Sequence, residues 1–240
     1  MTGAIFSYAL LAALATALLV AALTDLRARH IDNWLNAGIA IAAPLWWLAM
    51  GLGPLDIGIQ IGLAAATFAL ACTLFAMGQM GGGDVKLLTA LAFWFTPASF
   101  LQLIVLMAVL GGGASLAMAA CNMTPGRREA VRDTFAGLVT FAWLWCAGAI
   151  VFAVAMGRPV IAGSTVEAIA AVLPGIWPGI WIVPVVALAA MGAFLFGMRH
   201  IMRRQKSRIE VPYGIAIAAA SLWVMGSHTL AAARFAALAG

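Results

Sequence analysis

Residues 4–24 read AIFSYALLAALATALLVAALT, a run of 21 positions without a charged side chain. A helix of this length is about 30 Å long, which matches the hydrocarbon thickness of a membrane. Seven further apolar segments follow, at about 35–52, 57–77, 85–96, 98–121, 134–156, 177–198 and 211–231. The pattern predicts an all-α, polytopic membrane protein with about eight transmembrane helices.

The overall composition points the same way. The 240 residues are 65% hydrophobic and only 9% charged, whereas a soluble domain is about 25% charged. A soluble globular domain is therefore excluded, and so is a disordered chain, which would be polar and rich in charge. The three cysteines form no C-x-x-C pair and the three histidines form no ligand cluster. We expect no metal site and no cofactor.

The basic residues indicate how the helices are oriented. If the N-terminus lies outside, the loops after the first, third, fifth and seventh helices face the cytoplasm. These loops and the helix ends beside them hold 11 of the 13 Lys and Arg residues. Positive charge collects in cytoplasmic loops of membrane proteins, so this orientation is predicted. The same rule accounts for the net charge of +5, and we expect no nucleic-acid partner.

Two of the eight acidic residues stand apart from the others. Asp25 closes the first apolar run, and Asp84 follows the three glycines Gly81, Gly82 and Gly83 in a predicted loop. Two membrane crossings separate the acids, so both are expected at the cytoplasmic side although they are 59 positions apart in the sequence. Structural roles also fit: Asp84 as a helix N-cap, and Asp25 as a solvated partner of Arg27 or Arg29.

Two carboxyl groups a few ångströms apart cannot both ionise easily, so they share a proton. The ionised member can take a proton from water, and the protonated member can polarise a peptide carbonyl and protonate the leaving amine. Glycines beside Asp84 would let a substrate backbone approach closely. We therefore hypothesise that Asp25 and Asp84 form the catalytic dyad of an aspartyl protease.

Three stretches resemble the type IV prepilin leader peptidases, the GxGD class of membrane aspartyl proteases. They are Asp25 to Leu35 (DLRARHIDNWL), Met80 to Leu87 (MGGGDVKL) and Val211 to Ala218 (VPYGIAIA). The third is similar to the short peptidases of tight-adherence (Tad) pilus systems. The cysteine-rich loop of the bifunctional members is absent, so no methyltransferase activity is expected.

The resemblance implies a multi-pass enzyme of the bacterial inner (cytoplasmic) membrane. Its partners would be the lipid bilayer and a prepilin-like precursor, whose short basic leader it would remove at the cytoplasmic face. Catalysis is implied for Asp25 and Asp84. Substrate-binding or supporting roles are expected for Gly81, Gly82, Gly83, Lys86, Asp32 and Asn33. Lys86 would tune the acid, bind substrate or face lipid headgroups.

Two features depart from the family pattern. Asp32 stands where the family usually has the proline of I-P-N, and as a carboxylate it competes with Asp25 for the catalytic role or binds a basic leader. We favour Asp25, because the motif places the catalytic acid there. The segment 134–198 resembles an inserted helix pair within a single membrane peptidase domain, residues 1–240.

Two other functions stay open at this point. A proton- or cation-coupled transporter would use the same acids as ion sites, because acids at membrane depth also serve that purpose. A catalytically dead relative would act as a scaffold in pilus assembly. Cleavage of a precursor would identify a protease, and ion flux in vesicles would identify a transporter. Pilus assembly that continues without the two acids would identify a scaffold.

Overall fold

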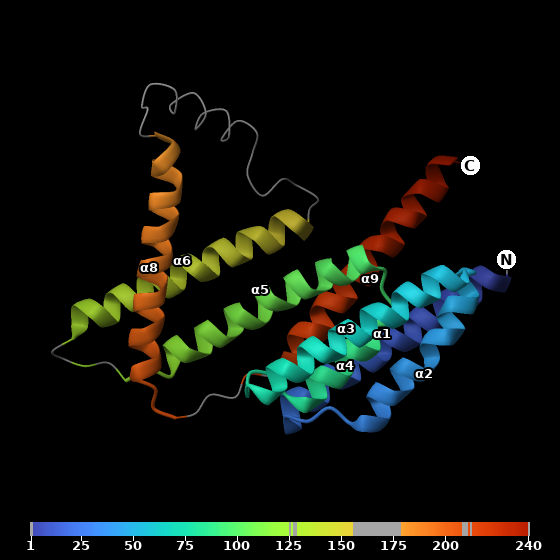
Figure 1. Cartoon of the computed structure of the whole chain (residues 1–240), viewed down its shortest axis with the longest axis horizontal. Helices are drawn as coiled ribbons and strands as arrows, with labels where there is room; N and C mark the ends of the chain where they lie inside the picture. The colour runs from blue at the N-terminus through green and yellow to red at the C-terminus, as the bar shows by residue number, and fades with distance from the viewer. Residues whose placement is uncertain are drawn as a thin grey trace. The chain divides into compact units, whose positions relative to one another are not determined.

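The structure is a computed structural model that describes residues 2–124, 126, 129–155, 179–207, 211 and 213–239. This part of the chain contains eight helices and no strand (Figure 1). The predicted all-α fold is therefore confirmed. The helices are α1 (Thr2–Ala28), α2 (Asn33–Met50), α3 (Pro54–Ala76), α4 (Gly82–Ala92), α5 (Pro97–Cys121), α6 (Ala130–Ala155), α8 (Gly179–Arg203) and α9 (Tyr213–Ala239).

Four of these helices are long and apolar enough to cross a membrane. The spans are Ile5–Ala28, Pro54–Ala76, Pro97–Cys121 and Ala130–Ala153. Large apolar side chains also face outward, with Ile41 75%, Leu48 77% and Leu55 77% exposed. Such surfaces suit a lipid environment, so the chain is a membrane protein. A total of eight crossings and an external N-terminus remain predictions.

The chain divides into two compact units. Unit 1 comprises Met1–Gly111 and Pro212–Gly240, and unit 2 comprises Gly112–Val211. The predicted inserted segment 134–198 falls within unit 2, although its residues 156–178 lie outside the described part. The single peptidase domain stays a prediction.

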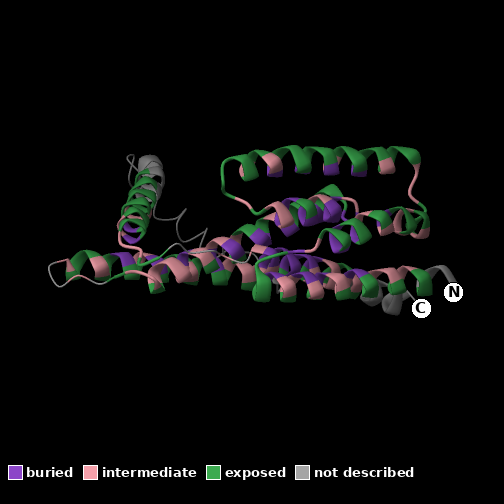
Figure 2. Cartoon of the chain, turned by 90° about the horizontal axis from the view of Figure 1, so that it is seen from below, coloured by how far each residue is buried: buried purple, intermediate pink, exposed green. Residues whose placement is uncertain are grey.

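The centre of unit 1 is its shortest helix, α4. It contacts α2, α3 and α9, while α1 packs against α2 and α9. Seven of its 11 residues are buried, and Leu87 and Leu91 are fully enclosed. The long helices around it are mostly exposed along their outer faces, and buried residues gather where helices meet (Figure 2). At about 1.5 Å per residue α4 is too short to cross a membrane, so it serves as a core element.

Tryptophan side chains hold the end of α4. The indole nitrogen of Trp94 donates to the carbonyl of Ile39 at 2.8 Å, and that of Trp47 donates to the carbonyl of Phe93 at 2.8 Å. Trp46 stacks on Trp94 with ring centroids 5.9 Å apart. Buried indole N–H groups require such partners. These contacts join α2 to the end of α4 and thereby position the helix that carries Asp84.

Unit 2 is built around the pairing of α6 with α8. Leu116, Ala136 and Ile201 form its buried core. The helices approach closely at Gly197, where an added Cβ would lie 3.3 Å from Val139 Cγ1. The turn after α5 is tied to the end of α8, because Thr124 N donates to Arg204 O at 3.0 Å.

Candidate functional site: a buried pair of acids

Asp25 lies inside α1, because the helix extends past the predicted end at residue 24 to Ala28. Only 7% of Asp25 is exposed. Arg29 follows the last helical residue; it has a left-handed backbone (φ 52°) and donates from its N–H to the carbonyl of Asp25 at 3.0 Å. This turn reverses the chain, so Ile31 follows as a buried residue rather than a solvated loop position.

Asp84 lies in the first turn of α4, where the predicted glycine loop is only partly correct. Gly82 and Gly83 are helical, and Gly81 is the N-cap residue with an extended backbone. The Asp84 carboxyl accepts a hydrogen bond from the Gly81 backbone N–H, as an acid at the third helical position does in a capping box. Gly81 therefore takes the N-cap position considered for Asp84, whose side chain is buried.

Ile31 lies between the start of α4, which carries Asp84, and the start of α9, which contacts Asp25. A Cβ at Gly83 would be 3.2 Å from Ile31 Cβ, and a Cβ at Gly214 would be 2.9 Å from Ile31 Cδ1. Ile31 itself is 2% exposed. A side chain at either glycine would force Ile31 or its neighbours to shift, since both contacts are tighter than ordinary packing. The starts of α4 and α9 therefore meet on one side chain.

The beginning of α9 contacts Asp25 directly. Gly214 N donates to Asp25 Oδ2 at 2.9 Å, across 189 positions of sequence. Backbone N–H groups in the first turn of a helix have no partner within the helix, and the helix dipole favours a negative charge there. This hydrogen bond fixes the Asp25 carboxyl against the start of α9.

The surroundings of Asp84 favour its protonated form. Burial, and after it the negative charge of Asp25, raise the pKa of Asp84 to about 6, while the hydrogen bond from Gly81 acts in the opposite direction. The influence of Asp25 means that the two carboxyl groups are electrostatically coupled. Both carboxyl groups thus accept a backbone N–H, and the charge of Asp25 disfavours ionisation of Asp84, an arrangement that suits general acid and base chemistry.

The other predicted site residues lie at the edge of this pair. Lys86 Nζ donates to Asn33 Oδ1 at 2.7 Å, and both residues are exposed. This contact joins the first turn of α4 to the start of α2. Asp32 is the N-cap residue of α2, and its side chain is 43% exposed and 3.6 Å from His30 Nε2. Asp32 thus faces a different, more solvated environment than the buried acids.

Three residues at the site were not among the predicted ones. Gly214 and Ile31 were quoted in the motifs but given no role, because their importance depends on contacts between distant segments. Asn36 is 4% exposed, and its Nδ2 donates to the carbonyl of Gly83 at 3.5 Å. Its Oδ1 is buried without a hydrogen-bond partner in the described part of the chain. A polar residue within an apolar helix was the available signal.

We expect Asp32→Pro to retain cleavage activity to within about twofold, the range usual for surface changes. The backbone of Asp32 has φ −63° and ψ 140°, which proline adopts without strain. Its side chain caps no backbone N–H of α2. Initial rates for Asp32→Pro and Asp32→Asn, set against wild type, measure the effect. A loss comparable to that of Asp25→Asn would make Asp32 a catalytic candidate.

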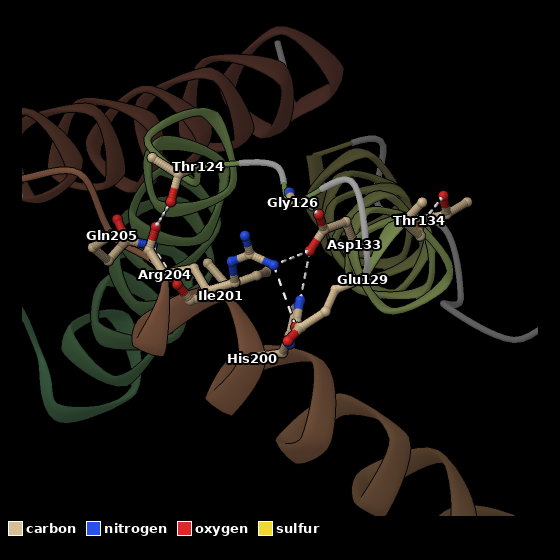
Figure 3. Close-up of polar contacts among 10 residues, drawn as sticks. Thr124, Gly126, Glu129, Asp133, Thr134, His200, Ile201, Arg204 and Gln205 are labelled. Carbon is tan, nitrogen blue, oxygen red and sulfur yellow. Dashed lines mark hydrogen bonds and ion pairs between the residues drawn. The ribbon is translucent and has the colours of Figure 1, made fainter.

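A second polar cluster lies in unit 2 (Figure 3). His200 Nε2 lies 2.7 Å from Asp133 Oδ1, and Arg204 Nη1 lies 3.3 Å from both Asp133 Oδ1 and Glu129 Oε2. Glu129, Asp133 and His200 are close enough together to hold a metal ion, a grouping not predicted from the sequence. Because the guanidinium of Arg204 already compensates both carboxylates, we assign no metal to this cluster.

A cavity of unit 1 is remote from the acid pair. It has a volume of about 430 Å³ and includes Ser7, Trp46, Gln60, Trp94 and His228 in its lining. Ser7 and Asp25 are 18 positions apart on α1, which corresponds to about 27 Å along the helix. The cavity therefore does not hold the groups that carry the candidate chemistry.

Comparison with known proteins bears on the first half of the chain. In the comparisons with curated proteins and with solved structures, nothing matches the chain. Residues 12–116 match the family model described as the type IV leader peptidase family. The matched region contains both buried acids and all the predicted supporting residues. It ends before α6, α8 and α9, so it does not include Gly214.

Proposed function

Since residues 12–116 match the family model described as the type IV leader peptidase family, we propose that this protein is a membrane aspartyl endopeptidase. It removes the leader peptide from prepilin-like precursors, with Asp25 and Asp84 activating a water molecule. The family supports a peptidase, and the four apolar helices support a membrane location. The aspartic mechanism is inferred from the two acids.

One observation carries the proposal. Two acids that are 59 residues apart in sequence are both buried, at 7% and 9% exposure, and the charge of one raises the pKa of the other. Burying carboxyl groups near each other costs free energy, and it is found chiefly where chemistry requires it. Capping explains one hydrogen bond of Asp84 but not the nearby burial of Asp25.

The geometry suggests a role for each acid. Asp25, whose negative charge helps to keep Asp84 protonated, acts as the base that takes a proton from water as the water oxygen attacks the peptide carbonyl carbon. Asp84, whose pKa is raised, holds a proton that polarises the carbonyl oxygen and then passes to the leaving amine. The peptide C–N bond breaks, and no covalent enzyme intermediate forms.

The proposed roles predict how activity depends on pH. Asp84 must be protonated, and its pKa lies at about 6, so cleavage should decline as pH rises through about 6. The direct check is the protonated carboxyl band of Asp84 in infrared spectra recorded across this range. In the Asp25→Asn protein the band should disappear at lower pH, because one of the two causes that raise the pKa is gone. An unchanged titration would contradict the coupling of the acids.

The substrate and the side of action follow from the charges. With the orientation predicted by the basic loops, both acids lie near the inner leaflet of the bacterial inner membrane. A precursor with a short basic leader before its apolar helix would present the scissile bond at that depth. The exposed Lys86–Asn33 contact at the start of α4 and α2 supports a place for the substrate at this rim.

Co-expression with a prepilin-like precursor tests the proposal. Leader removal is scored by mass spectrometry for wild type and for the Asp25→Asn, Asp84→Asn and Asp32→Asn proteins. The proposal expects cleavage by wild type and by the Asp32 variant only. Proton or cation flux in vesicles without any cleavage would favour a transporter. Pilus assembly that survives loss of both acids would favour a scaffold.

A further inference from the structure

Unit 2 contains a basic recess that is unrelated to the acid pair. The recess has a volume of about 290 Å³ and is lined by Arg132 of α6 and by Phe196, Arg199, His200 and Arg203 of α8. Three guanidinium groups from two packed helices thus border one hollow. Like charges placed this close repel one another, and an anion between them would relieve the repulsion.

The positive charge of the recess is not neutralised by the neighbouring acids. Glu129 and Asp133 are engaged by Arg204 and His200 (Figure 3). Among the described residues, the ion pairs of unit 2 involve neither Arg132 nor Arg199 nor Arg203, and all three are exposed. Arg204 is therefore paired with acids, whereas the three arginines that line the recess are available to bind an anion.

The position of the recess on its helices favours a ligand from the membrane. Arg132 lies in the first turn of α6, a helix long and apolar enough to span the bilayer. Arg203 and His200 lie in the last turn of α8. Helix ends of this kind meet the headgroup region, where basic pockets between helices bind anionic lipid headgroups. The dipole of α6 also favours an anion at its N-terminus.

Apolar side chains continue from the recess along both helices. Phe196 is 51% exposed and contacts Phe135, with ring centroids 6.0 Å apart, while Leu195 and Leu138 are 55% and 63% exposed. These surfaces offer a path for acyl chains beside a site for phosphate. A soluble anion would use only the arginines, whereas a phospholipid would use both features.

We propose that this recess binds the phosphate headgroup of an anionic phospholipid, with its acyl chains along α6 and α8. Arginine suits this ligand, because its planar guanidinium donates two hydrogen bonds to phosphate oxygens. The inference does not depend on the proposed peptidase function. A basic leader peptide would be repelled by the same charges.

The test is lipid binding by the full chain in nanodiscs. Phosphatidylglycerol and phosphatidylcholine are compared for wild type, for the Arg132→Gln/Arg199→Gln/Arg203→Gln protein and for each single variant. Each basic side chain near an anionic surface contributes about a factor of five in affinity. We expect each single variant to bind phosphatidylglycerol about fivefold more weakly and the triple variant roughly a hundredfold more weakly. Binding to phosphatidylcholine should not change.

Lys206→Gln is the matched control. Lys206 is an exposed cation at the end of α8 that does not line the recess, so its loss should leave phosphatidylglycerol binding unchanged. If Lys206→Gln weakened phosphatidylglycerol binding as much as a single arginine variant does, general surface charge would explain the effect and the proposal would be overturned. If the triple variant does not fold, the single variants decide, and affinity for phosphatidylglycerol equal to that of wild type in all three would also overturn the proposal. Competition by inorganic phosphate as effective as that by the lipid would indicate a soluble anion and overturn the lipid assignment.

Discussion

Replacing Asp84 by Asn should reduce leader cleavage by about a thousandfold or more, the scale on which a positioned acid contributes. Asn has nearly the same shape but cannot donate a proton to a leaving amine. Asp25→Asn should cause a similar loss, because the base that deprotonates water is removed. The double variant should be no worse than either single variant, since groups that act as a unit are not additive. Single-turnover cleavage of a synthetic precursor measures all three.

Stability separates a catalytic role of Asp84 from a structural one. The pKa of Asp84 in the folded protein, about 6, lies above the ordinary value of 3.8. The stabilisation that the protonated group gives is therefore complete below about 3.8 and is lost as pH rises through about 6. At pH 7.5, Asn removes an unfavourable charge, so Asp84→Asn should raise the melting temperature while abolishing activity.

Asp56→Asn is the matched control for the acid pair, because Asp56 is an exposed acid at the start of α3. It should cleave like wild type. Cleavage by Asp84→Asn at the rate of the Asp56 control would refute the dyad. If Asp84→Asn both abolished activity and lowered the melting temperature, Asp84 would instead have a structural role.

Gly214→Ala should reduce cleavage by about a hundredfold or more, the cost typical of an ångström-scale displacement in an active site. The added Cβ would lie 2.8 Å from Asp25 Oδ2 and 2.9 Å from Ile31 Cδ1. Real contacts are longer, so Asp25, Ile31 or the start of α9 must move. A movement of Asp25 or of the start of α9 disturbs the hydrogen bond from Gly214 N to Asp25. The rate of precursor cleavage and the binding constant for the precursor separate lost chemistry from lost binding.

Gly226→Ala is the control on the same helix, since a Cβ there meets nothing within 4 Å. Alanine favours a helix over glycine by about 1 kcal/mol, so this variant should be fully active and slightly more stable. If Gly214→Ala and Gly226→Ala were equally active, the contact between α9 and Asp25 would have no part in catalysis.

The amino-acid sequence by itself determined the helical class, the apolar segments and the two acids as candidates. These features are local, because hydropathy and helix length depend only on neighbouring residues. The glycine run was found as well, but its interpretation as a loop was wrong for Gly82 and Gly83. Helix ends depend on capping contacts, and Gly81 took the N-cap position.

Tertiary structure alone decided what surrounds the acids. Gly214 donates to Asp25 from 189 positions away, and Ile31 links the starts of α4 and α9. Arg204 likewise reaches Glu129 across 75 positions and leaves Arg132 to the recess. No pattern of neighbouring residues encodes such contacts. They follow from the packing of helices, which places a backbone N–H or a charge beside a group that is remote in the chain.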